Sequence, residues 1–286
     1  MKAIFSYMLL LCYAVSMGSC HSRAIPQGAT GNTAMDPKAT ATATASDLNA
    51  TATPFNTEIK DTLGNINLIG RSTRQRLQQA PFDSWFVKNY DAYSVDSATA
   101  DSLRGRLAGK QLLIFMGTWC GDSRREVPRI FKILDYCGID PSGVRLIMVG
   151  EGDPLYKQSP GHEEKGLNIF RVPDLIVYDQ GREMGRVIES PVRSLEKDLL
   201  AITSGEAYSP HYKGAVFLGN LFLQEGVRKI DRRLTQVAEQ LRPLVSSSRE
   251  LTGYAKVLRA TGKKKEAETT LRLNTLIFPP GNDPGK

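Results

Sequence analysis

An apolar segment, a short connection that ends in a cysteine, and an amphipathic segment follow one another, and this order constrains the fold of the chain more than any other feature. Residues 111–116 are mostly apolar, show no helical period and lie between Gly109 and Gly117, which is typical of a buried strand. In residues 122–136, four apolar side chains share one helical face: Val127, Ile130, Phe131 and Leu134. We therefore predict a buried strand, a short connection that holds Cys120, and a helix that packs on the sheet.

The segments that follow continue the alternation of strands and helices. Residues 144–149 form a second apolar run, and residues 174–178 and 184–188 flank a glycine-containing turn as in a β-hairpin. Ser194 precedes another apolar helical stripe and is a typical N-cap residue. The order of strand, helix, strand, hairpin and helix predicts an α/β fold.

The sequence Trp119-Cys120-Gly121 resembles the active-site entry of the thioredoxin superfamily. Pro128 lies eight residues after Cys120, where that family has a helix proline, and Val172-Pro173 precedes a strand as the cis-proline of the family does. The match covers residues 105–205 and is similar to secreted thioredoxin-like proteins of Bacteroidetes-type bacteria. It implies a thioredoxin-like domain over these residues, in which Trp119, Val172 and Pro173 bind a substrate peptide beside Cys120 in a cis-proline geometry.

The same comparison shows where this chain departs from the family. Ser123 stands at the position of the second cysteine, so Cys120 has no resolving partner one helical turn away. Ile114 stands where many thioredoxins carry a buried carboxylate that moves protons. A thiolate at a helix N-terminus still faces unpaired backbone N–H groups that stabilise it. We expect Arg124 and Arg125 to add to this stabilisation.

Two functions fit this pattern. In the first, Cys120 and Ser123 are catalytic residues of a monothiol thiol-disulfide exchange or isomerisation, with the Ser123 hydroxyl as hydrogen-bond donor to the sulfur. The partners are then client proteins or peptides with thiols or disulfides, and a low-molecular-weight thiol or a redox partner protein that releases the adduct. In the second, the domain is a noncatalytic binding module with a helical protein-interaction region. Neither function requires a cofactor.

A second cysteine in the same helix does not supply the missing partner. Cys137 lies near the end of the predicted helix, roughly 25 Å from Cys120 at the rise of an α-helix, which is beyond disulfide reach. We expect Cys137 to be a small buried apolar residue.

Residues 1–20 are typical of a bacterial lipoprotein signal peptide. Lys2 gives a positive start, an apolar stretch too short to span a bilayer follows, and Met17-Gly18-Ser19-Cys20 ends it. The resemblance implies cleavage before Cys20 and lipidation of this residue, which anchors the protein to a membrane without crossing it. Because His21 stands where an inner-membrane retention signal has aspartate, we expect the outer membrane, with the protein facing the periplasm of the cell envelope.

Two segments connect the signal to the α/β region. Residues 21–54 are rich in alanine and threonine and poor in large apolar side chains, so they cannot bury enough surface to offset the entropy of ordering. We predict a flexible tether there. Large apolar residues return from Phe55, and we predict an N-terminal helical extension over residues 55–104.

Residues 206–286 are predicted to be helical. One apolar stripe at three- and four-residue spacing predicts a single helix that packs on a partner: Val227, Ile230, Leu234, Val237 and Leu241. A later pattern resembles one tetratricopeptide unit: Leu251, Gly253, Tyr254, Ala255, Leu258, Gly262, Ala267, Leu271 and Pro279. Because one unit cannot form a solenoid, we expect it to dock on the preceding helices or on the α/β domain. Both a peptide-binding groove and simple packing fit the pattern.

Other function classes are disfavoured. Residues 206–286 hold 14 Lys and Arg against 8 Asp and Glu, but the run 263–265 has no interleaved aromatic residues, so we expect no nucleic-acid partner. The polar loop 151–166 has one histidine and no second one at ligand spacing, so we expect no metal site. No nucleophile elbow surrounds Ser123, which disfavours a hydrolase.

Overall fold

The computed structural model describes residues 54–279. The predicted signal peptide, Cys20 and the tether up to residue 53 lie outside the described residues. Within the described range, no helix is both long and apolar enough to cross a membrane.

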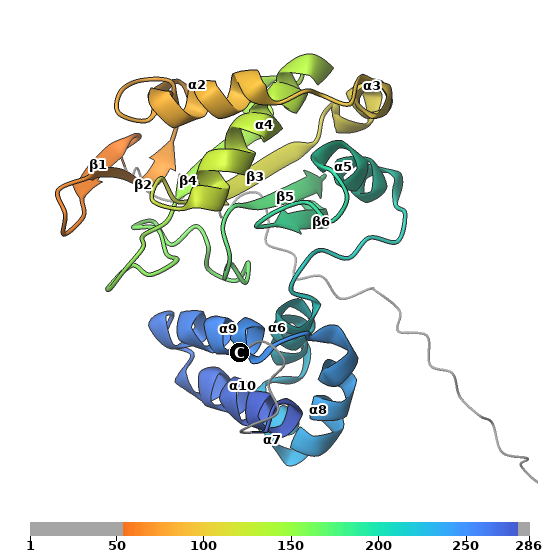
Figure 1. The fold of residues 1–286 in the computed structure, drawn as a ribbon. Coiled ribbons are helices and arrows are strands. Elements are labelled where there is room, and N and C mark those ends of the chain that lie inside the picture. Colours follow the sequence, from red (N-terminus) through yellow and green to blue (C-terminus); the bar gives the residue numbers. More distant parts are fainter. Residues whose placement is uncertain (1–53, 280–286) are drawn as a thin grey trace, which may run out of the picture. The chain divides into compact units, whose positions relative to one another are not determined.

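Six strands of the described chain form one mixed sheet (Figure 1). The strands are β1 (Thr57–Lys60), β2 (Ile66–Ser72), β3 (Gln111–Met116), β4 (Val144–Met148), β5 (Asp174–Asp179) and β6 (Arg182–Ile188). Their order across the sheet is β1-β2-β4-β3-β5-β6. Only β3 and β4 run parallel, joined by a helical crossover, and all other neighbours are antiparallel. The class is therefore mixed α/β, as predicted.

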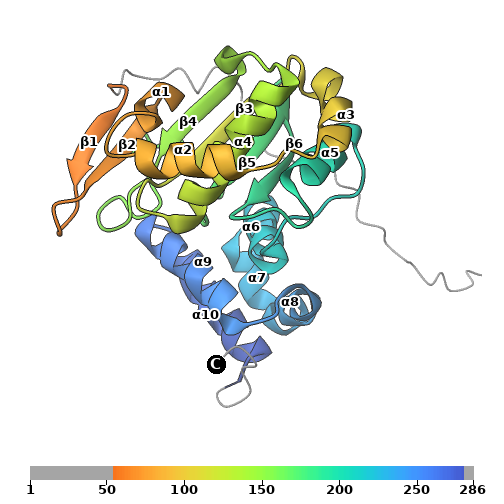
Figure 2. The same ribbon diagram turned by 45° about the horizontal axis from the view of Figure 1, so that its top comes forward.

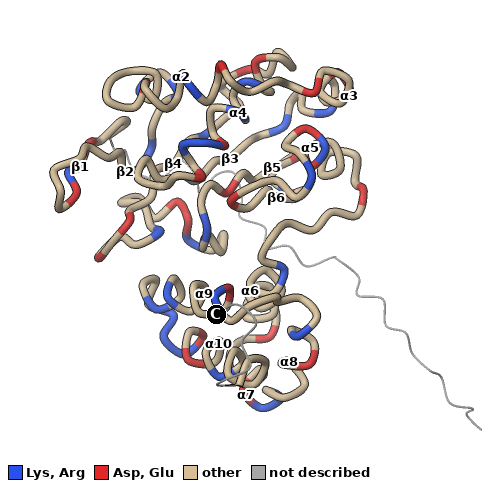
Figure 3. The backbone as a smooth tube through the Cα atoms, viewed as in Figure 1, with Lys and Arg blue, Asp and Glu red and all other residues tan. Residues whose placement is uncertain are grey.

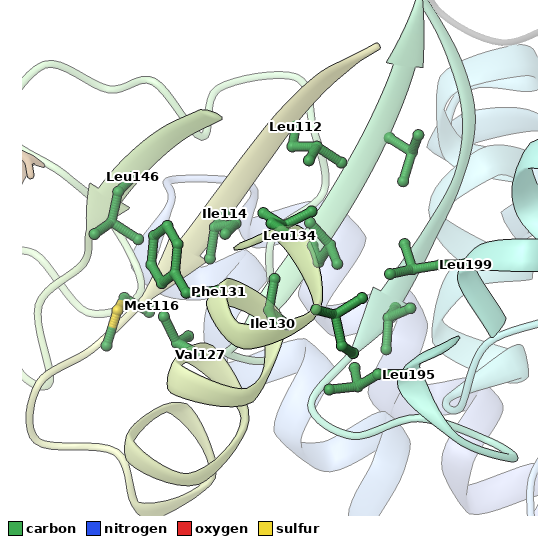
Figure 4. Close-up of a cluster of buried hydrophobic side chains, with 14 of the residues drawn as sticks. Leu112, Ile114, Met116, Val127, Ile130, Phe131, Leu134, Leu146, Leu195 and Leu199 are labelled. Atoms are coloured by element: carbon green, nitrogen blue, oxygen red, sulfur yellow. The ribbon is translucent and has the colours of Figure 1, made fainter. Parts of the chain in front are cut away.

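Five helices lie in the same part of the chain as the sheet. They are α1 (Arg74–Leu77), α2 (Asp83–Ala92), α3 (Ser97–Leu107), α4 (Gly121–Cys137) and α5 (Leu195–Ser204), with a 3₁₀ turn at Pro141–Gly143. The predicted apolar stripe of α4 is buried against β3 (Figure 4). Ser194 caps α5 through its side chain, as predicted.

The two faces of the sheet are covered differently. Side chains from α2, α4 and α5 cover one face, where they pack on Leu112, Ile114 and Met116 of β3. The opposite face carries Leu113 and Phe115 of β3 and is covered by the irregular chain between β4 and β5 rather than by a helix. Trp119 and Cys120 pack against this second cluster.

The region 55–104 is not wholly helical, because it contributes β1 and β2 to the sheet. β2 pairs with β4 in antiparallel fashion through Gly70, Arg71 and Ser72, and its residues Leu68 and Ile69 are buried. The sequence of β2 holds Asn67, Gly70 and Ser72, which weaken a strand pattern. The strand forms because it can hydrogen-bond to the edge of β4. This partner is distant in the sequence, so the local residue pattern does not reveal it.

Five further helices follow in residues 213–277 (Figure 2). They are α6 (Lys213–Glu225), α7 (Val227–Arg232), α8 (Leu234–Leu241), α9 (Ser248–Ala260) and α10 (Lys264–Ile277), with a 3₁₀ turn at Arg242–Leu244. The stripe from Val227 to Leu241 was expected to form one helix, and this is wrong. Arg233 has φ −131° and ends α7, so the stripe is divided between α7 and α8. Ile230, Val237 and Leu241 still share one buried cluster, and Leu234 packs against it.

These helices share a core with the end of the sheet. Phe170 and Ile188 belong to the same buried cluster as the apolar side chains of α6, α8, α9 and α10. The ring of Phe170 meets the rings of Tyr212 and Tyr254 edge-on, with centroids 5.9 and 5.2 Å away. The helices 213–277 therefore pack directly against the segment that leads into β5.

Candidate functional site

Cys120 lies where β3 ends and α4 begins. It is the N-cap residue of α4, and its backbone N–H donates to the carbonyl of Gly117 at 3.0 Å. Its side chain is partly exposed, and Sγ donates to the carbonyl oxygen of Val172 at 3.3 Å. The Val172–Pro173 peptide bond is cis. The predicted cis bond and its closeness to Cys120 are confirmed.

Trp119 is fixed beside the cysteine from three directions. Its indole N–H donates to the carbonyl of Val149 at 2.9 Å. A Cβ on Gly117 would lie only 2.4 Å from the indole, so glycine is required for the ring to lie there. The ammonium group of Lys157 lies 4.3 Å from the ring centroid. These contacts fix the position of the indole beside Cys120.

Ser123 does not contact the sulfur in the way the sequence suggested. Its side chain is fully buried, and its hydroxyl oxygen accepts the backbone N–H of Gly117 at 3.3 Å. The Cys120 thiol instead donates to Val172. Ser123 therefore secures the turn between β3 and α4, and its expected role as donor to the sulfur is not observed.

The two arginines expected beside the thiol are engaged elsewhere. Arg124 donates to the carbonyl oxygen of Thr118. Arg125 pairs with Asp122 at 2.7 Å and with Glu126 at 2.6 Å. The cation that lies over the ring of Trp119, the neighbour of Cys120, is Lys157, which the sequence analysis did not identify.

Lys157 lies in the chain between β4 and β5, where charges of both signs follow one another (Figure 3). Its side chain is only 7% exposed. Burial lowers the pKa of Lys157 to about 8, while the negative charge that Cys120 can carry opposes this change. Arg171 lowers the pKa further, and Glu189 and Glu151 raise it.

A second charged group adjoins this pair. Arg171 lies 3.5 Å from Glu189, and Tyr212 donates a hydrogen bond to the same carboxylate. Burial raises the pKa of Glu189, and the positive charges of Arg171 and Lys157 partly offset this increase. Lys157, Glu189 and Tyr212 all have positive φ, at 57°, 64° and 63°. Non-glycine residues adopt this conformation at an energetic cost, and such residues concentrate at functional sites.

The sheet does hold a buried carboxylate, although not at position 114. Ile114 is fully buried in the apolar cluster under α4. Asp174 directly follows Pro173 and is also fully buried, with one oxygen 3.2 Å from Arg186 and the other without a hydrogen-bond partner. Burial raises the pKa of Asp174 to about 7, against the opposing charge of Arg186. Asp174 begins the strand predicted over residues 174–178, but the burial of its carboxylate was not predicted.

Contacts with the C-terminal helices and with the residue before α6 hold the loops that carry the site. Tyr254 of α9 donates to the Asn168 side chain at 2.8 Å, and the Gln158 amide donates to the carbonyl of Ala260 at 3.2 Å. The guanidinium of Arg171 lies 4.8 Å from the centroid of the Tyr212 ring. The chain beside Lys157 and the chain before Pro173 are therefore both fixed by residues outside the sheet.

The remaining predicted residues lie apart from the site. Cys137 is buried at the end of α4, as expected, and is a free thiol like Cys120. In residues 54–279, no group of three or more His, Cys, Asp or Glu side chains is arranged to hold a metal ion.

Comparisons with known proteins add little to this geometry. No protein-family model and no curated protein matches the chain. Among solved structures, a protein of unknown function from Pseudomonas aeruginosa is 17% identical over 45% of this chain and 87% of its own, with a TM-score of 0.34. An HIV epitope-scaffold is 16% identical over 45% of this chain and 88% of its own, also with a TM-score of 0.34. Similarity at this level supports no functional conclusion.

Proposed function

We propose that this protein is a membrane-tethered thioredoxin-like protein of the bacterial cell envelope, in which Cys120 carries out monothiol thiol-disulfide exchange or isomerisation on client proteins. The observation that carries the proposal is the 3.3 Å contact between Cys120 Sγ and the carbonyl oxygen of Val172, next to a cis Val172–Pro173 bond. A partly exposed thiol at this position can meet a disulfide of a client chain.

The proposed reaction has two exchange steps. The Cys120 thiolate attacks one sulfur of a client disulfide, so that a Cys120–client disulfide forms and the other client sulfur leaves as a thiolate. Ser123 cannot attack this adduct, because its oxygen replaces the second sulfur. A low-molecular-weight thiol, or a thiol of a partner or client protein, then attacks the client sulfur as its thiolate and releases Cys120 as a thiolate. Isomerisation results when the attacking thiol belongs to the same client.

The test uses the full chain and oxidised glutathione. We expect one glutathione on the tryptic peptide 111–124, a long-lived adduct, and rapid release when reduced glutathione is added. Cys120→Ser should abolish the adduct and the exchange of a small disulfide. Cys137→Ser is the matched control and should change neither, because Cys137 is buried. Absence of the adduct near neutral pH in the folded wild-type protein would contradict the proposal.

A noncatalytic binding module is the second candidate function. The Cys120 thiol donates its hydrogen bond to the Val172 carbonyl, so the sulfur is engaged by the protein's own backbone. In that case Cys120→Ser would leave binding of a partner unchanged and no exchange would be measured. Under this proposal α9 and α10 form the tetratricopeptide-like unit, and a partner protein binds the helices.

The membrane tether is a separate part of the proposal. We propose that Cys20 becomes the lipidated N-terminus and that the protein faces the periplasm from the outer membrane. Growth with a labelled fatty acid should label the wild-type chain and not Cys20→Ala. An unmodified mature N-terminus elsewhere, found by mass spectrometry, would exclude the lipid anchor without affecting the chemistry at Cys120.

A further inference from the structure

Lys157 is a buried cation without a carboxylate at ion-pair distance among residues 54–279. Its side chain is 7% exposed, and the aromatic faces of Trp119 and Tyr156 lie 4.3 and 5.9 Å from its ammonium nitrogen. A buried charge is costly unless a group of opposite charge or a polar group compensates it. The quadrupole of an indole face supplies part of this compensation.

The backbone holds Lys157 in place over the indole. Its N–H donates to the carbonyl of Gly150, and the N–H of Gly150 donates to the carbonyl of Gln158, both at 2.9 Å. A Cβ at Gly150 would lie 2.6 Å from the carbonyl oxygen of Leu155, so the loop closes too tightly for a side chain there. Lys157 itself has φ 57°, a strained conformation for lysine. These backbone hydrogen bonds and the close contact at Gly150 fix the loop, and with it the position of the Lys157 ammonium group.

The candidate nucleophile Cys120 lies next to the same indole. Cys120 is the next residue in the chain, and both Trp119 and Cys120 pack on the cluster of β3, β4 and β5 side chains. Trp119 thus has the buried ammonium group over its ring and the candidate nucleophile as its neighbour. Of the acidic groups that act on Lys157, Cys120 acts most strongly.

We propose that Lys157 is the positioning residue that stabilises the Cys120 thiolate by its charge, in place of the arginines at the start of α4. This inference rests on the proposed thiol chemistry at Cys120 and names the group that regulates it. Deprotonation of the thiol removes its hydrogen bond to the Val172 carbonyl. The carbonyl oxygen and the negative sulfur then repel each other unless a positive charge lies nearby. The Lys157 ammonium compensates that charge, and the thiolate in turn compensates the buried ammonium.

The charged neighbours define the pH range of this effect. The charged and titratable groups that act on Lys157 and on Glu189 come from the start of α4 and from the loops around it: Cys120, Asp122, Glu151, Arg171, Glu189 and His211. Lys256 of α9 lies over the same Tyr156 ring as Lys157. Because Lys157 stays protonated below about pH 8, its charge acts on the sulfur at neutral pH and is lost above that value. The electrostatic effect of Lys157 on the sulfur should therefore weaken as the pH rises above about 8.

The test measures the rate at which iodoacetamide alkylates Cys120 in the full chain as a function of pH. Mass spectrometry of the tryptic peptide 111–124 reports this cysteine alone. Lys157→Met keeps the apolar stem but removes the charge. We expect its alkylation rate near neutral pH to fall about tenfold and its pH profile to shift upward by about one unit. Lys157→Arg keeps the charge and should restore the rate to within about twofold of wild type.

Lys256→Met is the matched control, because Lys256 also lies over an aromatic ring, 4.2 Å from the centroid of Tyr156. Its alkylation profile should coincide with that of wild type. If Lys157→Met lowers the unfolding temperature, Lys157→Gln replaces it. A neutral variant at position 157 that stays folded and keeps the wild-type profile would overturn the inference. Alkylation requires no client, so a shifted profile without glutathione exchange would support the inference and reject the proposed function.

Discussion

Gly117 leaves the space that the indole of Trp119 occupies, because a Cβ at position 117 would lie 2.4 Å from the ring atom Cε2. The indole N–H is at the same time bonded to the Val149 carbonyl at 2.9 Å. Residue 117 therefore determines whether Trp119 can lie under Lys157 and beside Cys120. The absence of a side chain at one residue positions the whole candidate site.

We expect Gly117→Ala to displace the Trp119 ring and to lower the free energy of unfolding by about 1–3 kcal/mol, the usual cost of overpacking. Urea denaturation measures the stability, and indole fluorescence reports the altered surroundings of Trp119. Gly105→Ala is the control, since nothing lies within 4 Å of a Cβ there and the residue is inside α3. This control should raise the stability by about 0.5–1 kcal/mol. Equal stabilities for the two variants would show that the ring yields without cost.

Replacing Ser123 by cysteine should convert the proposed monothiol into a dithiol. Position 123 lies one helical turn after Cys120 and is fully buried, so a sulfur there is protected and close to any adduct. We expect Ser123→Cys to shorten the lifetime of the glutathione adduct on Cys120 at least about tenfold, because the second attack becomes intramolecular. The lifetime is measured by mass spectrometry after removal of free glutathione. Ser84→Cys adds an exposed cysteine in α2 and should leave the lifetime unchanged.

Much of the sheet and its crossover helix could be predicted because the determining pattern is local. The run Gln111–Met116 coincides with β3, and the stripe of α4 faces the core as its spacing requires. Strand β2 was not predicted, because its partner β4 lies more than seventy residues away in the chain. Arg233 ends α7 inside an otherwise regular stripe, and no proline or glycine marks the break.

The candidate site was predictable only in part, for a similar reason. Cys120, Trp119 and Pro173 could be found from a motif and its resemblance. Lys157 belongs to a polar loop in which nothing distinguishes it from Lys165 until the loop closes on the indole. The arginines near the cysteine in sequence were preferred, although backbone and carboxylate oxygens bind both of them.

The hydrogen bond between Tyr254 and Asn168 should couple the C-terminal helices to the site. Tyr254 is 2% exposed, and its hydroxyl donates to the Asn168 amide oxygen at 2.8 Å. We expect Tyr254→Phe to lower the free energy of unfolding by about 1–2 kcal/mol, because a buried polar partner is left unsatisfied. Tyr136→Phe also removes a hydroxyl, but its acceptor Asp101 is exposed, so the loss should stay below about 0.5 kcal/mol. Equal losses in urea denaturation would show that burial of this bond has no effect.

Asp174 should make the stability of the protein depend on pH in a narrow range. Burial raises the pKa of Asp174 from 3.8 to about 7 in the folded protein. The folded state therefore binds more protons than the unfolded state between these values, and stability falls as pH rises through this range. Arg186 stays charged, because Asp174 and Glu183 outweigh the effect of burial and raise its pKa.

The measurement compares the unfolding free energy of wild type with that of Asp174→Asn at a series of pH values. Because the amide does not titrate, the difference between wild type and variant should decline by on the order of 1–4 kcal/mol from about pH 4 to about pH 7, and stay level above that. Asp179→Asn in the same strand removes only the ion pair with Lys110, at 3.0 Å and partly exposed. Its difference from wild type should stay nearly constant from about pH 5 to about pH 7. A constant difference for Asp174→Asn over this range would show that Asp174 is ionised throughout, held so by Arg186.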